Sequence, residues 1–244
     1  MKKHFALAIA IAALAATTVY FVSFHDTGVT DYYQKYVKGR KTVSDVMRQH
    51  EAAVAARLKE NFKNIKINYP PDKIALIVLK SEKILELWIE TGEAAILLKK
   101  YTILGASGGA GPKLIEGDCQ VPEGIYKIES LNPNSHFHLS MKVNYPNEFD
   151  LKKAAADGRN NPGGDIFIHG NKMSVGCIAI GDEAVEELFI LSARAIKNGI
   201  KVIIMPYDMR KTGRLAAENP GVKTRPLWIN ELYSNISDEI VKYK

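Results

Sequence analysis

The chain has 244 residues, of which 46% are hydrophobic and 25% are charged, with a formal net charge of +6. This composition is that of a globular protein with one substantial core or two small domains, and no repeat of about 20 to 50 residues indicates a solenoid or propeller. The modest positive charge suits an anionic envelope polymer, but no basic stripe with interleaved aromatic residues predicts nucleic-acid binding.

The N-terminal segment predicts export. Two lysines, Lys2 and Lys3, precede the uncharged and mostly apolar run from Phe5 to Phe24. Basic residues before an apolar run are typical of a secretory signal. A small-x-small cleavage site lies at residues 13–15, but the run continues past it and is about long enough to span a bilayer. Residues 1–24 are therefore predicted to be a signal peptide or an inner-membrane anchor, with the rest of the chain in the periplasm or cell envelope.

Residues 25–72 are predicted to form a spacer followed by a helical segment. The first part is polar and rich in tyrosine. From Thr42 to Phe62, apolar residues recur at a spacing of three to four, and Thr42 or Ser44 can cap the helix. Pro70 and Pro71 end the helical segment.

Residues 73–206 are predicted to form a strand-rich domain. Short apolar or alternating runs indicate strands at 74–79, 85–90, 94–104, 124–128, 137–143, 166–168, 178–180 and 200–205. The first three strands favour an antiparallel meander, and helices are expected at 151–158 and 182–198. We therefore expect an α+β fold, mostly β with flanking helices.

Two further segments complete the chain. The glycine-rich residues 105–124 lack the lysine and hydroxyl residue of a phosphate-binding loop, so we interpret them as a surface loop. Residues 207–244 form a polar, partly helical tail, with an amphipathic helix near 227–241. This tail either packs back on the domain or covers a groove.

One histidine and one cysteine concentrate the candidate chemistry. His169 and Cys177 lie eight positions apart, between two short apolar runs that predict neighbouring strands of a hairpin. Such a hairpin brings the thiol within hydrogen-bond reach of the imidazole, and an imidazolium partner lowers a thiol pKa. Gly176 leaves room for a substrate carbonyl, and the backbone amides of Gly176 and Cys177 are candidate oxyanion donors. Ser174 is a candidate for fixing the turn.

Three structural alternatives apply to the same residues. A cysteine in an apolar strand is often packing only. In an oxidising compartment, Cys119 and Cys177 can instead form one disulfide. A zinc site is disfavoured because only His136 and His138 are available to supplement the pair.

The stretch resembles the catalytic signature of the L,D-transpeptidase (YkuD-type) family, which is a His-Gly pair, a variable loop and Ser-x-Gly-Cys. The matching residues here are His169-Gly170 and Ser174-Val175-Gly176-Cys177. Flanking blocks also resemble the family over about residues 73 to 206, namely GPKL at 111–114, PEGIYKI at 122–128 and HLSMKVNYPN at 138–147. They are similar to the subgroup that includes a murein hydrolase releasing lipoprotein from peptidoglycan.

The resemblance implies a β-sandwich or barrel-type domain with a cysteine nucleophile. The nucleophile attacks the diaminopimelate carbonyl of a peptidoglycan stem peptide, and an amine or water resolves the resulting thioester. By carry-over, Cys177 is the nucleophile, His169 is the general base and acid, and the carbonyl of Gly170 orients the imidazole. His138, Tyr145 and Asn147 are candidates to line the donor groove. Their alternative is a structural role in a turn and on the polar face of a strand.

Departures from the family pattern bear on whether water or an amine resolves the thioester. Val175 stands where most members carry a second histidine, and Ala179 stands near a family arginine. The loop before Cys177 is also shorter than in cross-linking enzymes, which favours hydrolysis over 3–3 cross-linking. Arg159 or Lys113 can pair with stem carboxylates, although solvated surface charge is the simpler interpretation.

The sequence therefore predicts a peptidoglycan-modifying cysteine enzyme without a cofactor. Its expected partners are stem peptides, a murein-linked lipoprotein and the inner membrane if the N-terminal segment is uncleaved. The alternatives are a transpeptidase that forms 3–3 or protein–murein links, and a non-catalytic murein-binding envelope module.

Overall fold

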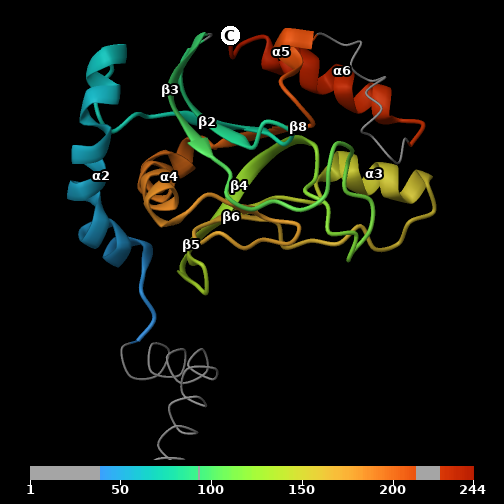
Figure 1. Ribbon diagram of the computed structural model, residues 1–244, viewed down its shortest axis with the longest axis horizontal. Coiled ribbons are helices and arrows are strands. Elements are labelled where there is room, and N and C mark those ends of the chain that lie inside the picture. The colour runs from blue at the N-terminus through green and yellow to red at the C-terminus, as the bar shows by residue number, and fades with distance from the viewer. Residues whose placement is uncertain (1–38, 93, 213–225) are drawn as a thin grey trace, which may run out of the picture. The chain divides into compact units, whose positions relative to one another are not determined.

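A computed structural model describes residues 39–92, 94–212 and 226–244 (Figure 1). The predicted signal or anchor at residues 1–24 lies outside these residues. Among the helices that are described, none combines the length and the apolar character needed to cross a membrane. All of the described helices and strands belong to one unit, Thr42–Lys244.

An eight-stranded mixed sheet forms the frame, in the order β3-β2-β1-β8-β4-β5-β6-β7. The pairs β1–β8 and β6–β7 are parallel and the other pairs are antiparallel. The strands are β1 (Ile74–Leu79), β2 (Ile84–Thr91), β3 (Ala94–Thr102), β4 (Gly124–Ser135), β5 (His138–Val143), β6 (Phe167–His169), β7 (Ile178–Ala179) and β8 (Lys201–Met205).

The two edges of this sheet meet beyond β3. Gly105 bridges Ala179 of β7, with Leu104 N–H 2.8 Å from the Ala179 oxygen and Ala179 N–H 2.8 Å from the Gly105 oxygen. The continuation of β3 thus gives the sheet a barrel-type closure. The predicted α+β class, a sheet with flanking helices, is confirmed.

Helices cover both faces of the sheet, as Figure 1 shows. The first face packs against α2 (Val43–Ile65) and α4 (Asp182–Ala195), and the second packs against α6 (Ile229–Ile240). All six residues of β1 are consequently buried, with Leu76 and Val78 in the first core and Ala75 and Ile77 in the second. This two-sided burial explains why β1 reads as a continuous apolar run instead of an alternating one.

Side-chain caps fix where two of the helices begin. Thr42 accepts from Asp45 N–H, and the Asp45 carboxylate accepts from Thr42 N–H at 2.8 Å. In the same way Asn147 caps α3 (Glu148–Ala156) through Asp150, so this helix starts three residues before the predicted Leu151. Such reciprocal caps satisfy amides that a helix leaves without intrahelical partners.

The C-terminal tail packs back on the domain. Short helix α5 (Met209–Thr212) leads towards α6, whose buried Ile236 and Tyr233 belong to the second core. The hydroxyl of Tyr233 donates to the buried carboxylate of Glu123 at 2.8 Å. Of the two predicted roles for the tail, the structure therefore shows the first.

Candidate active site

The two strands that carry the candidate pair are parallel. Ile168 pairs with Ile178 and His169 pairs with Ala179, so the predicted hairpin is wrong. The eight residues 170–177 return the chain to the start of β7, which is possible because β6 has only three residues and β7 only two. Cys177 immediately precedes β7, and alternate strand residues share a face, so His169 and Cys177 project from the same face. Their Cα atoms are about 8 Å apart by strand geometry.

Backbone contacts fix the orientation of His169. Its Nδ1 lies 2.7 Å from the carbonyl oxygen of Gly170. A carbonyl only accepts, so Nδ1 carries the hydrogen and Nε2 keeps a lone pair. The ring of Phe137 lies against the imidazole, with centroids 4.5 Å apart. Because His169 is buried, desolvation lowers its pKa more than the Gly170 contact raises it. The imidazole is therefore neutral at neutral pH.

Gly170 is the residue that this geometry requires. A Cβ at this position would lie 2.6 Å from Asp182 Oδ1 and 2.7 Å from the Phe137 oxygen. Both distances are too short for real contacts, so a side chain would displace the carbonyl that holds the imidazole.

The thiol of Cys177 rests on the backbone of the preceding segment. Its sulfur lies 3.4 Å from the Asp165 oxygen and 3.4 Å from Phe167 N–H. No hydrogen bond joins it to His169, although both residues are described. Burial raises the pKa of the Cys177 thiol, and Phe167 N–H and Lys113 lower it less. The expectation of a lowered thiol pKa is therefore wrong for the resting structure, because the sulfur is partly desolvated and has no imidazolium beside it.

The backbone amide of Gly176 already has a partner. Its N–H donates to Ser107 Oγ at 2.7 Å, and the Ser107 hydroxyl donates to the Cys119 oxygen at 2.6 Å. Gly176 therefore does not direct a free N–H at an oxyanion in this structure, and the Cys177 amide stays a candidate. The glycine-rich segment, expected to be a surface loop, is a loop with exposed residues, and it also supports the residue before the cysteine. A single serine among glycines was the only signal of this role.

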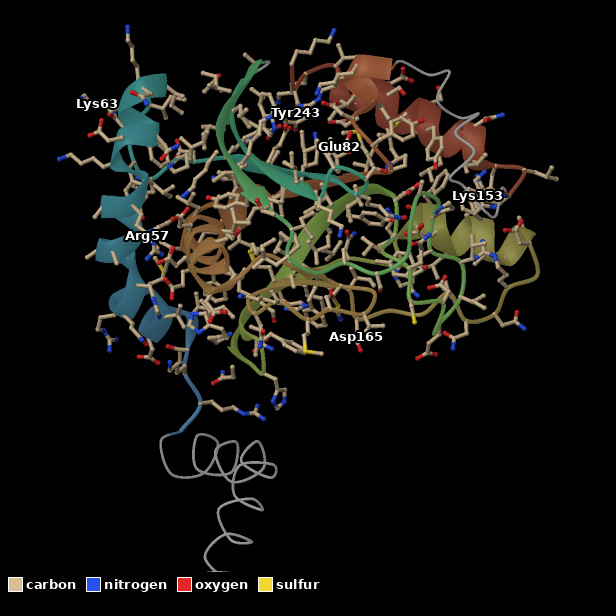
Figure 2. The ribbon with its side chains drawn as sticks, in the orientation of Figure 1. Arg57, Lys63, Glu82, Lys153, Asp165 and Tyr243 are labelled. Atoms are coloured by element: carbon tan, nitrogen blue, oxygen red, sulfur yellow. The ribbon has the colours of Figure 1, made fainter. Side chains whose placement is uncertain are left out.

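A pocket of about 190 Å³ is lined by Gly176, the residue before Cys177. Val175 and Gly176 form one wall, and Cys119 and Asp165 also line it. Figure 2 labels Asp165, which belongs to the segment leading into β6. Val175, in the position of the family's second histidine, is 71% exposed. Both cysteines are free, so the disulfide alternative is not formed here.

Loop 113–118 owes its position to three of the residues considered as ligands. Lys113 is buried and its Nζ lies 2.5 Å from Asp118 Oδ1. Arg159 donates to the Leu114 oxygen at 2.6 Å, and the hydroxyl of Tyr145 lies 3.4 Å from the Lys113 oxygen and 2.9 Å from the Pro162 oxygen. Lys113 is thus not a solvated surface charge, because the loop encloses its ammonium group.

The remaining predicted residues also have structural contacts. Asn147 caps α3 and donates from Nδ2 to the Ile125 oxygen at 3.0 Å. His138 Nε2 lies 3.0 Å from Glu186 Oε1. None of His138, Tyr145 and Asn147 lines the pocket beside the cysteine. Ser174 Oγ, expected to fix the turn, is enclosed and has no hydrogen-bond partner among the described residues.

Comparisons with known proteins match the strand-rich part of the chain. The family model YkuD, described as the L,D-transpeptidase catalytic domain, matches residues 65–204. Proteins named "Putative L,D-transpeptidase YafK" in Escherichia coli K12 and O157:H7 are each 34% identical over 137 residues, which cover 54% of this chain and 53% of theirs. The chain thus spans about half the length of these curated relatives.

Two solved structures resemble this chain at a lower sequence identity. The helical cell shape determining protein Pgp2 of Campylobacter jejuni is 20% identical, with a TM-score of 0.46 over 71% of this chain and 56% of its own. Bd1075 of Bdellovibrio bacteriovorus is also 20% identical, with a TM-score of 0.42 over 62% and 60%. Both are too distant to support an inference about this chain.

Proposed function

We propose, from the premise that the chain belongs to the YkuD family of L,D-transpeptidase catalytic domains, that it is a cysteine enzyme acting on peptidoglycan stem peptides. The observation that carries the proposal is the contact between His169 Nδ1 and the Gly170 oxygen at 2.7 Å. It leaves Nε2 as a base on the face from which Cys177 projects. The bond cleaved is the amide bond at the diaminopimelate carbonyl.

The first step forms a thioester. A rotation about the Cα–Cβ bond of Cys177 takes the sulfur from the Asp165 oxygen towards Nε2 of His169. The sulfur attacks the carbonyl carbon while Nε2 accepts the thiol proton, so a C–S bond forms and no free thiolate is required. The imidazolium then gives this proton to the departing amine nitrogen as the C–N bond breaks. The Gly170 carbonyl holds the ring in one tautomer through both transfers.

The second step frees the enzyme. Nε2 accepts a proton from water while the water oxygen attacks the thioester carbon. The proton then passes from the imidazolium to the sulfur as the C–S bond breaks. Hydrolysis is favoured over transfer to an amine because the short 170–177 loop leaves the pocket bordered by an exposed Val175. The site of action is outside the cytoplasm, in accord with the export signal expected at residues 1–24. An uncleaved signal makes the inner membrane a candidate partner, and the resemblance to the murein-hydrolase subgroup makes a murein-linked lipoprotein another.

The test is digestion of purified murein, with the muropeptides identified by mass. We expect the unmodified protein and Cys119→Ser to release products that have gained one water at a diaminopimelate-linked amide, and Cys177→Ser to release none. Cys119→Ser is the matched control because it removes the other cysteine of the chain, which lines the pocket.

Two other outcomes discriminate between the alternatives. New diaminopimelate–diaminopimelate cross-links would overturn hydrolysis but retain the cysteine chemistry. If every protein leaves murein unchanged but is retained on it, the result would contradict the enzyme and support a non-catalytic murein-binding module.

A further inference from the structure

Three side chains with metal-binding atoms, none of them in the catalytic pair, converge at one place. His50 comes from α2, His138 begins β5 and Glu186 lies in α4. Glu186 Oε1 is 3.0 Å from His138 Nε2 and 3.3 Å from His50 Nδ1. All three atoms lie within 4.8 Å of one another. They come from positions far apart in the sequence, so no local motif announces them.

The carboxylate is held in the orientation that a metal ligand needs. Arg57 Nη2 lies 2.8 Å from the other oxygen of Glu186, Oε2, which leaves Oε1 to face the two imidazoles. Figure 2 labels Arg57 on α2, and its guanidinium also contacts Glu187 of α4 at 3.1 Å. Ligating carboxylates commonly have such a hydrogen-bonded second partner. The side chains of His50 and Glu186 are only 14% and 13% exposed, whereas that of His138 is 34% exposed. The ligand atoms from α2 and α4 are therefore on largely buried side chains, and His138 is the most exposed of the three.

The backbone at His138 is unusual. Its φ is 71°, in the left-handed region that non-glycine residues seldom adopt. Such a conformation carries backbone strain, and strained residues concentrate at functional sites. His138 is one of six described non-glycine residues with a positive φ, and its imidazole meets Glu186.

The donor set determines which ion fits. Two imidazole nitrogens and one carboxylate oxygen are the protein ligands of many zinc sites that keep a fourth position for water. Magnesium and calcium prefer oxygen ligands alone. We propose that His50, His138 and Glu186 form a binding site for a divalent transition-metal ion of the zinc class, which joins α2 to α4 and β5.

Binding requires only a change of tautomer. Each imidazole nitrogen that now faces Oε1 gives up its hydrogen, which a neutral ring carries on its other nitrogen instead. The lone pairs so exposed bind the ion, and Oε1 becomes the third ligand. The ion takes no part in the thioester chemistry. However, Phe137, which precedes His138, lies against the ring of His169, so the site adjoins the catalytic base.

Metal binding can be measured without reference to activity, so this proposal and the proposed function fail separately. The full chain without a histidine tag is used in a Cys119→Ser/Cys177→Ser background, because thiolates also bind zinc. We expect ZnCl2 titration calorimetry to show one site. CoCl2 should give the visible absorption of nitrogen and oxygen coordination, with no sulfur charge-transfer band.

Single substitutions then identify the ligands. His50→Gln, His138→Asn and Glu186→Gln should each weaken zinc binding at least about tenfold, since even loss of an outer-shell partner costs about 10–100-fold. Asparagine tolerates the left-handed backbone at position 138. His136→Asn is the matched control and should bind zinc as the parent does. Zinc should raise Tm in the parent and in this control only.

Three results would overturn the proposal. One is no zinc binding by the parent. Another is undiminished zinc binding by the three ligand variants, measured on protein whose zinc-free circular dichroism matches that of the parent. The third is equally strong binding of MgCl2, which would indicate a general cation site.

Discussion

At the scale of single residues, the resting site holds a neutral acid and a neutral base. Burial raises the pKa of Cys177 and lowers that of His169, so neither shift favours a thiolate–imidazolium pair. The proposed chemistry therefore depends on proton transfer during attack. This differs from cysteine sites in which an adjacent cation keeps the thiol ionised.

The pH dependence of alkylation tests this protonation state. A raised thiol pKa means less thiolate at every pH below it, so iodoacetamide should modify Cys177 at a rate that keeps rising above about pH 8.5, the ordinary thiol pKa. Peptide mass spectrometry separates this cysteine from Cys119. His169→Gln should leave the midpoint of the profile unchanged. A plateau below about pH 7, abolished in that variant, would instead reveal an ion pair at rest.

At the scale of elements, the start of α3 explains the role of Asn147, which the family resemblance suggested for substrate binding. Asn147 accepts from Asp150 N–H at 3.1 Å and ties the helix to β4 through the Ile125 oxygen. Both hydrogen bonds join the Asn147 side chain to backbone atoms of the protein itself. The asparagine is therefore expected to support stability and not substrate affinity.

Substitution at this cap separates the two roles. Asn147→Ala should lower the free energy of unfolding by about 1–2 kcal/mol, because alanine cannot cap the helix. The KM for a peptidoglycan substrate should stay unchanged. Asn160→Ala, at an exposed asparagine, should change the unfolding free energy in urea by less than about 0.5 kcal/mol. An increased KM at unchanged stability would return Asn147 to the substrate groove.

At the scale of the whole molecule, buried charges attach the tail to the sheet. Glu86 is fully buried in β2, and Arg210 donates to it at 2.8 and 3.1 Å and to the carbonyl of Tyr243 at 3.1 Å. Although burial opposes it, hydrogen bonds from Arg210, Lys100 and Trp88 hold the pKa of Glu86 below its usual range. A depressed carboxyl pKa stabilises the fold above about pH 4.3, and this stabilisation is lost as the pH falls.

Removal of the guanidinium should therefore destabilise the molecule. Arg210→Ala should cost about 3 kcal/mol at pH 7, at the lower end for a broken buried pair because Lys100 still lies 3.0 Å from Glu86. The difference in unfolding free energy from the parent should shrink as the pH falls towards 4. Lys211→Ala is the matched control, since that exposed lysine lies 3.8 Å from Asp208, which Arg210 also contacts. Equal effects of the two substitutions would show that the network contributes little.

Much of the fold follows from local patterns. A continuous apolar run and alternating runs predicted the meander β1–β3, and the three-to-four spacing after Thr42 predicted α2. The His-Gly and Ser-x-Gly-Cys spacing indicated the family to which the chain belongs. These features are encoded by residues close in sequence, where side-chain period and capping act directly.

What the tertiary structure decided concerns direction and distant partners. The register of β6 against β7 makes the two strands parallel, and the support of Gly176 depends on the distant Ser107. The raised thiol pKa comes from packing around Cys177, which no motif records. By itself, then, the sequence determined the elements, the family and the candidate pair. Strand direction, the ionisation of that pair and the cluster around Glu186 arise only when segments many residues apart come into contact.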